Sequence, residues 1–388
     1  MRLKWRSSKL MSFQSIAYNM ATLPSLFRTF LSDIRPQDEH QDAYKEGHET
    51  LRDRLQDDDN IEEFYVADFL QGSYRRWTAL RPKEGEKSDV DIVLVTDLQD
   101  YEAEDALEQC EPFLEEHYKD QWEPNDHSYE IQEEDVELDL VLTVAPSEAI
   151  QEVAKALGSL DIGTALSEDD LSTVAGALNM SVDGDEQWKE EPLEVPDREA
   201  NKWESTHPLA TIAVTLDKND STDGHYVNVV KAIKWWRRTK IPEIDGPRSY
   251  PLERIIWECC PDDIDSVAEG VTRTFEQIER QFKSEAGNED IPFLPAHGLP
   301  AIPEHNALKH IDGEAFAAFH NEVSDAAQLA RAALEEEDKA TSRDLWHELF
   351  GDEFPPYGTD GESGDGGEKA MTLGSSSQVD DPSDHQFA

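Results

Sequence analysis

The stretch that most constrains this chain is 72–95, where a Gly-Ser pair precedes two aspartates and an aliphatic run. Gly72 lets the backbone turn and approach a phosphate closely, because it has no Cβ. Ser73 adds a hydroxyl to the N–H donors of such a turn. Asp89 and Asp91 open an extended segment, so their side chains leave the same face, roughly 6.6 Å apart. Carboxylates so placed can share two Mg²⁺ ions about 3.5–4 Å apart, the arrangement for in-line phosphoryl transfer.

An isolated D-x-D pair can also be a solvated strand end, and an acidic chain makes such ends common. Here the pair follows Gly72-Ser73 and leads directly into the apolar run 92–95. A strand that is apolar on both faces is typical of the buried interior of a sheet. The combination therefore favours a metal-binding edge on a buried sheet.

Residues 135–143 supply a third carboxylate. One face of this predicted strand is apolar, with Val136, Leu138, Leu140 and Leu142. Glu137 and Asp139 lie on the other face, where burial of a carboxylate costs several kcal/mol unless a cation balances it. The metal pair at Asp89 and Asp91 would be that cation. Asp139, with a leucine on each side, is the predicted third ligand, and Glu137 is the alternative.

The remaining periodicity predicts a mixture of helices and strands. Apolar spacing predicts helices from residue 23 to just beyond 33, over 39–55 and over 102–118, strands over 63–70 and 90–95, and mostly helix over 208–350. Residues 146–191 are interpreted as an insertion with two helical pieces. The tail, 358–388, is rich in Gly, Ser and Asp and is predicted to be disordered.

The charge of the chain is extreme, with 35 Lys and Arg against 86 Asp and Glu, for a net charge of −51. Disorder is one explanation, but nine Trp and regular apolar periodicity argue against it. We favour adaptation to high salt in a halophile, because a Debye length of about 3 Å at 1 M salt screens the self-repulsion. An acidic surface also binds nucleic acid and anionic membrane poorly, so neither an extended nucleic-acid interface nor a membrane is expected.

The cysteines indicate a reducing compartment. Cys110, Cys259 and Cys260 form no C-x-x-C pair and no disulfide framework. No segment approaches 18 apolar residues, and the basic N-terminus lacks the apolar core of a signal peptide. We therefore expect a cytoplasmic protein.

The positive charge is gathered in two patches. Residues 75–87 and 231–240 hold five cations each, ten of the 35 in the chain. A basic helix face is usually solvated, but so uneven a distribution favours use on a triphosphate. Lys231 and Lys234, on a predicted helix, are the candidates for that contact.

The block G-S-Y-R-R-x-T-A-x-R-P followed by D-V-D-I-V resembles that of the CD-NTases. These relatives of cyclic GMP-AMP synthase and oligoadenylate synthetase make nucleotide second messengers in the anti-phage systems called CBASS. W-E-S-T-H-P at 203–208, T-D-G-H at 222–225 and W-H-E-L-F-G-D-E-F-P at 346–355 are also similar to that family. The resemblance runs from about residue 23 to residue 355.

The resemblance implies an α+β fold: a polymerase-β-like nucleotidyltransferase core with a mixed sheet, and a helical C-terminal lobe of the oligoadenylate synthetase or poly(A) polymerase kind. The active site would lie in the cleft between them. The expected organisation is a core with N-terminal helices over 1–205, including the insertion, a helical lobe over 206–357 and an acidic tail over 358–388.

The resemblance also implies a synthase that joins NTPs, with ATP among them, and releases pyrophosphate with two Mg²⁺ or Mn²⁺ ions. Carried onto this sequence, Gly72 and Ser73 hold the donor phosphates. The metal ligands and catalytic residues would be Asp89, Asp91 and Asp139. The triphosphate would be neutralised by Lys231 and Lys234, with a further contact from Ser249.

Three features depart from the family pattern: Trp77 stands where a small residue is expected, Pro146 lies seven positions beyond Asp139, and the insertion is long. They leave the clade and the product open: the bases joined, the linkage, and whether the product is cyclic or linear. The alternatives are a nucleotidyltransferase acting on a tRNA or protein, and a non-catalytic nucleotide-binding module. The compact basic patches and the intact set of aspartates argue against these.

The resemblance finally implies partners. A downstream effector would respond to the product. The C-terminal Gln386-Phe387-Ala388 could be presented to a ubiquitin-like conjugation enzyme, as in some relatives, and a simple solubilising tail is the alternative.

Overall fold

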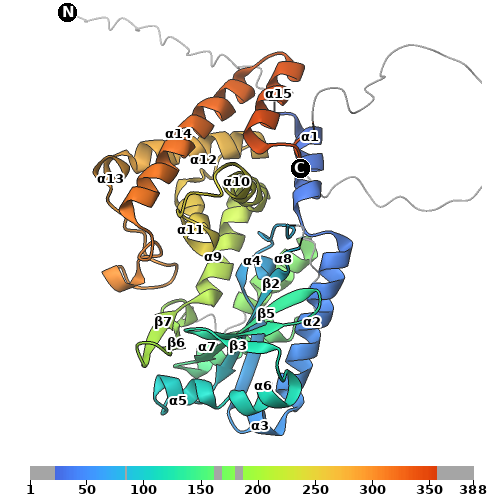
Figure 1. Ribbon diagram of the computed structural model, residues 1–388, viewed down its shortest axis with the longest axis vertical. Coiled ribbons are helices and arrows are strands. Elements are labelled where there is room, and N and C mark those ends of the chain that lie inside the picture. The colour runs from blue at the N-terminus through green and yellow to red at the C-terminus, as the bar shows by residue number, and fades with distance from the viewer. Residues whose placement is uncertain (1–21, 84, 161–167, 180–186, 356–388) are drawn as a thin grey trace, which may run out of the picture.

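A seven-stranded mixed sheet forms the base of the molecule in the computed structural model, which describes residues 22–83, 85–160, 168–179 and 187–355 (Figure 1). The strands are β1 Tyr65–Leu70, β2 Ser88–Thr96, β3 Trp122–Pro124, β4 Ser128–Gln132, β5 Val136–Val144, β6 Leu193–Asp197 and β7 Lys202–Thr206. Their order is β1-β2-β5-β4-β3, and β6 pairs with both β5 and β7. The central pair, β2 with β5, is parallel and the other pairs are antiparallel. The tail predicted over 358–388 lies outside the described residues.

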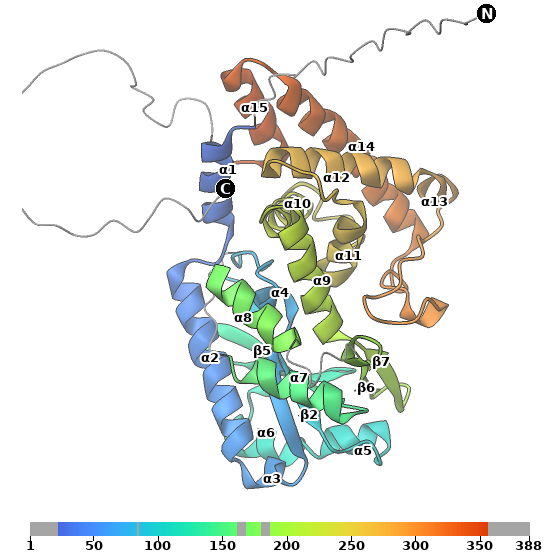
Figure 2. The ribbon, with the colours of Figure 1, turned by 180° about the vertical axis from the view of Figure 1, so that it is seen from behind.

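Two layers of helices cover the sheet. Its first face packs on α2 Asp38–Asp57, α3 Asp59–Glu62, α5 Ala103–Glu108 and α6 Glu111–His117. Its second face packs on α7 Glu148–Gly158, with α8 Glu168–Asn179 beside it (Figure 2). The short 3₁₀ helix η2 Gln187–Lys189 leads into β6. Because α7 packs directly on β1, this part of the predicted insertion belongs to the layer that covers the sheet.

The strand predictions follow the alternation of the chain closely. In β5 the apolar face is buried, while Glu137 and Asp139 on the other face remain half-buried. The interior of β2 is buried on both faces, as its continuous aliphatic run predicts. One helix prediction is wrong: residues 102–118 form two helices, α5 and α6. The break falls just before Pro112, which has no N–H for a helical hydrogen bond.

A bundle of helices stands above the sheet (Figure 1). It comprises α9 Pro208–Ser221, α10 Tyr226–Lys240, α11 Ser249–Cys259, α12 Val267–Gln281, α13 Lys283–Asn288, the 3₁₀ helix η3 Pro303–His305, α14 Gly313–Glu335 and α15 Lys339–Phe350. The first helix, α1 Pro24–Ile34, packs on α10 and α12 rather than on the sheet. We call α1 and α9–α15 the helical lobe, and the sheet with its helices the core. Together they make the α+β fold with a mixed sheet that the sequence predicts.

An aromatic cluster joins α1 to the end of α15. The ring of Phe27 lies 5.0 Å from that of Trp346, 6.0 Å from that of Phe350 and 5.1 Å from that of Phe354, each measured between centroids. Edge-to-face pairs at such distances add to the stabilisation from burial. The cluster therefore fastens the first described helix to the last.

Phe27→Ala is expected to lower the free energy of unfolding by about 3–5 kcal/mol, the usual cost of deleting a buried phenyl ring. Phe27 is 2% exposed. The matched control is Phe293→Ala, because Phe293 is 49% exposed and should change stability by only about 0.5 kcal/mol. Denaturant unfolding of both variants measures the difference, and equal effects would contradict the role of the cluster.

Candidate active site

The parallel pairing of β2 and β5 brings the three predicted aspartates together. Asp91 lies directly opposite Asp139 in the register, and Asp89 lies one pleat away on the same face. One carboxylate oxygen from each of the three lies within 4.8 Å of the others. Further along this face β2 continues with Val93 and Val95, which are buried in the apolar cluster that contains α7. The aspartates thus lie at one end of a strand face whose following residues are aliphatic and buried.

The hydrogen bonding of this group leaves room for a cation. The Oδ1 atom of Asp139 is buried and has no hydrogen-bond partner among the described residues. Glu137, the alternative ligand, instead accepts a hydrogen bond of 2.6 Å from Gln132 Nε2. Because a buried carboxylate oxygen without a donor is costly, an added cation at Asp139 would compensate it. The three aspartates therefore fit a divalent metal site, and Glu137 fits it less well.

Crowding of like charge shifts the acidity of the same residues. Loss of solvation, followed by repulsion from Asp91 and Asp139, raises the pKa of Asp89 to about 8. Asp89 nevertheless keeps an exposed side chain, as an ion-binding group at the edge of a site must. Burial, followed by repulsion from Asp91, raises the pKa of Asp139 to about 7. Burial also raises the pKa of Asp91, although Arg76 counteracts it.

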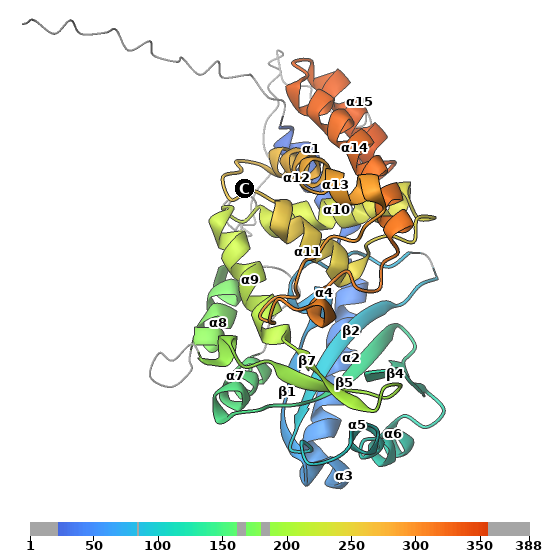
Figure 3. The ribbon, with the colours of Figure 1, turned by 90° about the vertical axis from the view of Figure 1, so that its left-hand side faces the viewer.

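Gly72 is required for contact with this acidic group. Its φ is +72°, and a Cβ at this position would meet Asp91 Oδ2 at 1.7 Å. The neighbouring Gln71 N–H donates to the backbone carbonyl of Asp91 at 2.9 Å. The Gly-Ser turn at the start of α4 Gly72–Arg75 is therefore packed directly on the aspartate, and α4 lies between the sheet and the helical lobe (Figure 3).

Ser73 and the departure at Trp77 belong to the same turn. The Ser73 hydroxyl is half-buried and makes no hydrogen bond to any described residue, so it can serve a ligand. Its carbonyl accepts the Thr78 N–H at 2.9 Å. Trp77 has a left-handed φ of 55° and is buried in the core. The large residue thus points into the protein and leaves the turn unobstructed.

Lys234 is paired within the protein, which the sequence did not predict. Its Nζ donates to Glu253 Oε1 at 2.8 Å and to the Thr78 carbonyl at 3.0 Å. Arg76 also bonds Glu253, at 3.1 Å. Burial opposes ionisation of Glu253, but Arg76 and Lys234 outweigh it and lower its pKa to about 2. No periodicity or motif in the sequence pointed to Glu253 or to its bond with Arg76.

Lys231 lies one turn before Lys234 on α10 and has a different environment. It is half-buried and forms no ion pair with a described residue. Burial lowers its pKa to about 8, and repulsion from Arg35 and Lys234 adds to this. Ser249 is exposed at the first position of α11, one turn before Glu253 on the same side of the helix. Both residues are thus available to a ligand beside the Glu253 contacts.

Several cations of the two basic patches have structural partners. Arg237 is buried and donates to the carbonyls of Pro247 at 3.2 Å and Ile241 at 2.6 Å. Arg81 pairs with Glu353 at 2.9 Å. The uneven distribution of charge therefore reflects internal contacts as well as any ligand.

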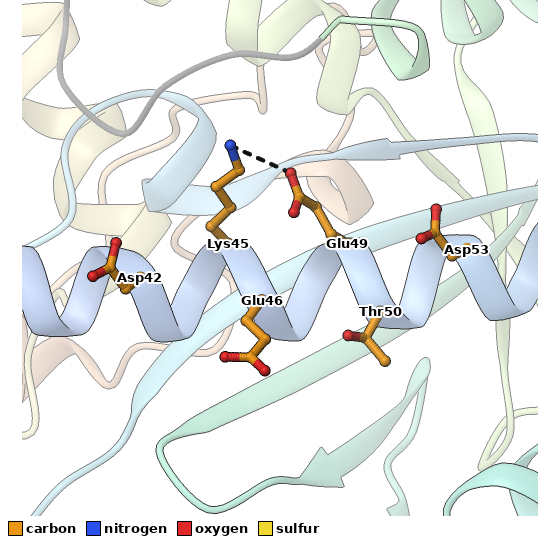
Figure 4. Close-up of a pocket in the computed structure, with 6 residues that line it drawn as sticks. All are labelled: Asp42, Lys45, Glu46, Glu49, Thr50 and Asp53. Atoms are coloured by element: carbon orange, nitrogen blue, oxygen red, sulfur yellow. Dashed lines mark ion pairs between the residues drawn. The ribbon is translucent and has the colours of Figure 1, made fainter.

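Other features of the described residues fit a ligand less well. Two further groups could contribute metal ligands: Asp58, Glu116 and His117, and His127, Asp197 and Glu204. In each, an ion pair occupies a ligand atom: His117 with Asp58 at 2.6 Å, and Glu204 with Lys202 at 2.8 Å. A hollow on α2 is lined only by polar side chains, including the ion pair of Lys45 and Glu49 at 3.6 Å (Figure 4). It is separate from the three aspartates.

Comparison with known proteins agrees with this geometry. Residues 20–156 match the Second Messenger Oligonucleotide or Dinucleotide Synthetase domain, SMODS. A probable cyclic AMP-AMP-GMP nucleotide synthase of Salmonella paratyphi B is 35% identical over 370 residues, covering 90% of this chain and 96% of the relative. A cyclic AMP-AMP-GMP synthase of Enterobacter hormaechei is 35% identical over 361 residues, covering 88% and 94%.

Solved structures show the same fold. E. coli MS115-1 CdnC with ATP has a TM-score of 0.57 at 15% identity, covering 85% of this chain and 98% of that one. The Bradyrhizobium diazoefficiens CD-NTase CdnG in complex with GTP has a TM-score of 0.58 at 13% identity, covering 85% and 96%. The fold and the relatives define a nucleotidyltransferase that synthesises cyclic oligonucleotides. This chain belongs to the CD-NTase family.

Gly72→Ala should remove the divalent-ion response of the protein, because the new methyl group would displace the Asp91 carboxylate. We expect the Mg²⁺- or Mn²⁺-induced rise in melting temperature to disappear and synthase activity to fall by about 10²-fold or more, as for a misplaced catalytic group. The matched control is Gly85→Ala. Gly85 has a φ of +83° but nothing within 4 Å of an added Cβ. Both variants carry the left-handed strain of about 1–2 kcal/mol, so equal loss of the ion response would contradict the contact.

The raised pKa values predict how stability depends on pH without divalent ions. Unfolded carboxylates ionise near pH 4, whereas folded Asp139 and Asp89 hold their protons to about 7 and about 8. Between about pH 4 and pH 8 the folded state thus binds more protons than the unfolded state does. The contribution of these two carboxyl groups to stability therefore falls as pH rises through that window. Below about pH 4 both states are protonated and the contribution is constant.

Asp139→Asn should therefore gain stability relative to the parent as pH rises from about 5 to 8.5 in EDTA. Melting curves at matched salt measure the difference. Mg²⁺ should raise the melting temperature of the parent alone and reverse the order at high pH. A constant difference across the range would contradict the crowding of charge at Asp139.

Proposed function

We propose that this enzyme joins ATP and GTP into a cyclic AMP-AMP-GMP-type trinucleotide, with pyrophosphate released at each bond. The relatives with that printed activity are 35% identical to this chain, whereas a cyclic AMP-AMP-AMP synthase of Acinetobacter is 24% identical. The observation that carries the chemistry is the convergence of Asp89, Asp91 and Asp139 within 4.8 Å beside the Gly-Ser turn.

In this proposal the three aspartates are the catalytic residues and the ligands of two divalent ions. Mg²⁺ or Mn²⁺ bound there would lower the pKa of an attacking ribose hydroxyl and stabilise the leaving pyrophosphate. Asp139, which has an unpartnered carboxylate oxygen, is the proposed neighbour of the attacking hydroxyl. The acceptor ribose hydroxyl would give its proton to the Asp139 carboxylate while its oxygen forms a bond to the α-phosphorus of the donor nucleotide, and the bond from this phosphorus to the pyrophosphate oxygen breaks.

The remaining predicted residues hold the donor nucleotide. The turn at Gly72 and Ser73 faces the phosphates, and the Ser73 hydroxyl is free to donate to them. Lys231 contributes positive charge from α10, and Ser249 adds a contact at the start of α11. Lys234 stays paired with Glu253, so it would attract the triphosphate by its positive charge without a direct hydrogen bond.

The proposed setting is nucleotide signalling in anti-phage defence, with a downstream effector that recognises the product. No helix among the described residues is long and apolar enough to cross a membrane. We propose that the enzyme works in a cytoplasm of high salt, where the net charge of −51 is screened. Conjugation at the C-terminus concerns residues outside the described part of the chain and stays a prediction.

Incubation of the pure protein with all four NTPs in high KCl with Mg²⁺ or Mn²⁺ tests the proposal. Chromatography and mass spectrometry should show a cyclic product containing two adenosines and one guanosine. Asp91→Asn and Asp139→Asn should lower its yield by about 10²-fold or more while the fold persists, because each removes a charge that stabilises the transition state. Asp263→Asn is the control, since the Asp263 side chain is exposed and pairs with Arg273 of α12 rather than with any residue of the candidate site.

Near-parental yield from either active-site variant would contradict the metal assignment. The same incubation with radiolabelled NTPs tests the alternatives. If NTPs alone gave no product but the label were transferred to added tRNA or protein, a macromolecular acceptor would be supported instead. ATP binding without turnover under all these conditions would support a non-catalytic module.

A further inference from the structure

Glu253 is a buried carboxylate at the contact of the two lobes. It is 6% exposed and comes from α11 in the helical lobe. Arg76 and Thr78, from the core, donate to it at 3.1 Å and 2.9 Å. Lys234, from α10, donates to it at 2.8 Å. Every one of these donors is itself largely buried, so the group excludes water and its bonds hold a defined geometry.

The same bonds reach the turn that packs on the metal-binding face. The Thr78 N–H donates to the Ser73 carbonyl at 2.9 Å, and the Arg76 N–H donates to the Gly72 carbonyl at 3.2 Å. Two residues that hold Glu253 by their side chains thus hold the Gly-Ser turn by their backbones. Movement of Glu253 would therefore move the turn relative to the aspartates.

The charges of this group do not cancel. Arg76 and Lys234 carry two positive charges, and Glu253 supplies one negative charge. The remaining positive charge lies near enough to Asp91 to act on that carboxylate, and in a region with little water it would also attract a further anion. A triphosphate on the Gly-Ser turn would be such an anion, whereas full neutralisation by a second carboxylate would remove the attraction.

We propose that Glu253 is a positioning residue of this active site, an inference that rests on the proposed function. It fixes the Gly-Ser turn to the helical lobe and orients Arg76 and Lys234 toward the triphosphate with one positive charge in excess. Glu253 itself does not contact the nucleotide. It acts through the two cations and through Thr78.

Glu253→Gln tests this role, because the amide has the size of the carboxylate but presents N–H donors to a guanidinium that needs an acceptor. We expect kcat for product formation to fall by about 10²-fold as the turn loses its position. We also expect the Kd for adenosine 5′-(α,β-methylene)triphosphate with Mg²⁺ to stay equal or decrease, because a competing negative charge is gone. Calorimetry measures the binding, and initial rates at saturating NTP measure kcat.

The matched control is Asp68→Asn. Asp68 is 2% exposed, lies on β1 at one end of the strand order, and accepts from Arg52, Gln56 and Tyr65. A merely structural role for Glu253 would lower kcat equally in both variants and in proportion to the folded fraction seen by circular dichroism. That result would overturn the proposal, as would weaker binding of the analogue by Glu253→Gln.

Thr78→Val provides a second test should Glu253→Gln fail to fold. It removes one donor to Glu253 and keeps the backbone bond to Ser73, so kcat should fall less, with analogue binding unchanged. Parental kcat in this variant would overturn the proposal. If the parent enzyme itself makes no product from NTPs, the proposed function fails, and the analogue affinities then report on the charge of the site alone.

Discussion

The parallel pairing of β2 with β5 is the constraint on which the rest of the structure depends. It sets Asp91 opposite Asp139 and keeps Asp89 on the same face, although their negative charges repel. The aliphatic residues further along both strands are buried under helices on two sides and stabilise the pairing against this repulsion. The sheet thereby holds an electrostatic strain that a divalent cation would relieve, which is the property a metal site needs before its ion arrives.

Around the aspartates, polar contacts between the lobes fix the surroundings. Gly72 packs on Asp91 with no space for another atom. Arg76, which follows the turn, donates to the Glu253 carboxylate and so connects the turn to the helical lobe. Such buried ionic contacts contribute little net stability but penalise any other arrangement strongly. The turn is therefore held from below by the sheet and from above by α10 and α11.

The parts of the site that depend on local pattern could be predicted from the sequence. The alternation in 135–143 and the spacing of Asp89 and Asp91 determine which side chains share a face, and the structure has them so. Glu253 could not be found in this way, because its bond to Arg76 spans 177 positions and carries no local signal. Charge counting was similarly limited: a sequence does not show that Arg237 bonds carbonyls of its own lobe.

The position of α1 has a mechanical consequence. Since α1 belongs to the helical lobe, the chain passes between lobes twice: from Ile34 to Asp38, and from Thr206 to Pro208. Two chain crossings restrict the relative motion of two bodies more than a single crossing does, and they favour rotation about the line through both. A rotation of the helical lobe would thus favour one direction, and nucleotides of different size would meet a similar path of closure.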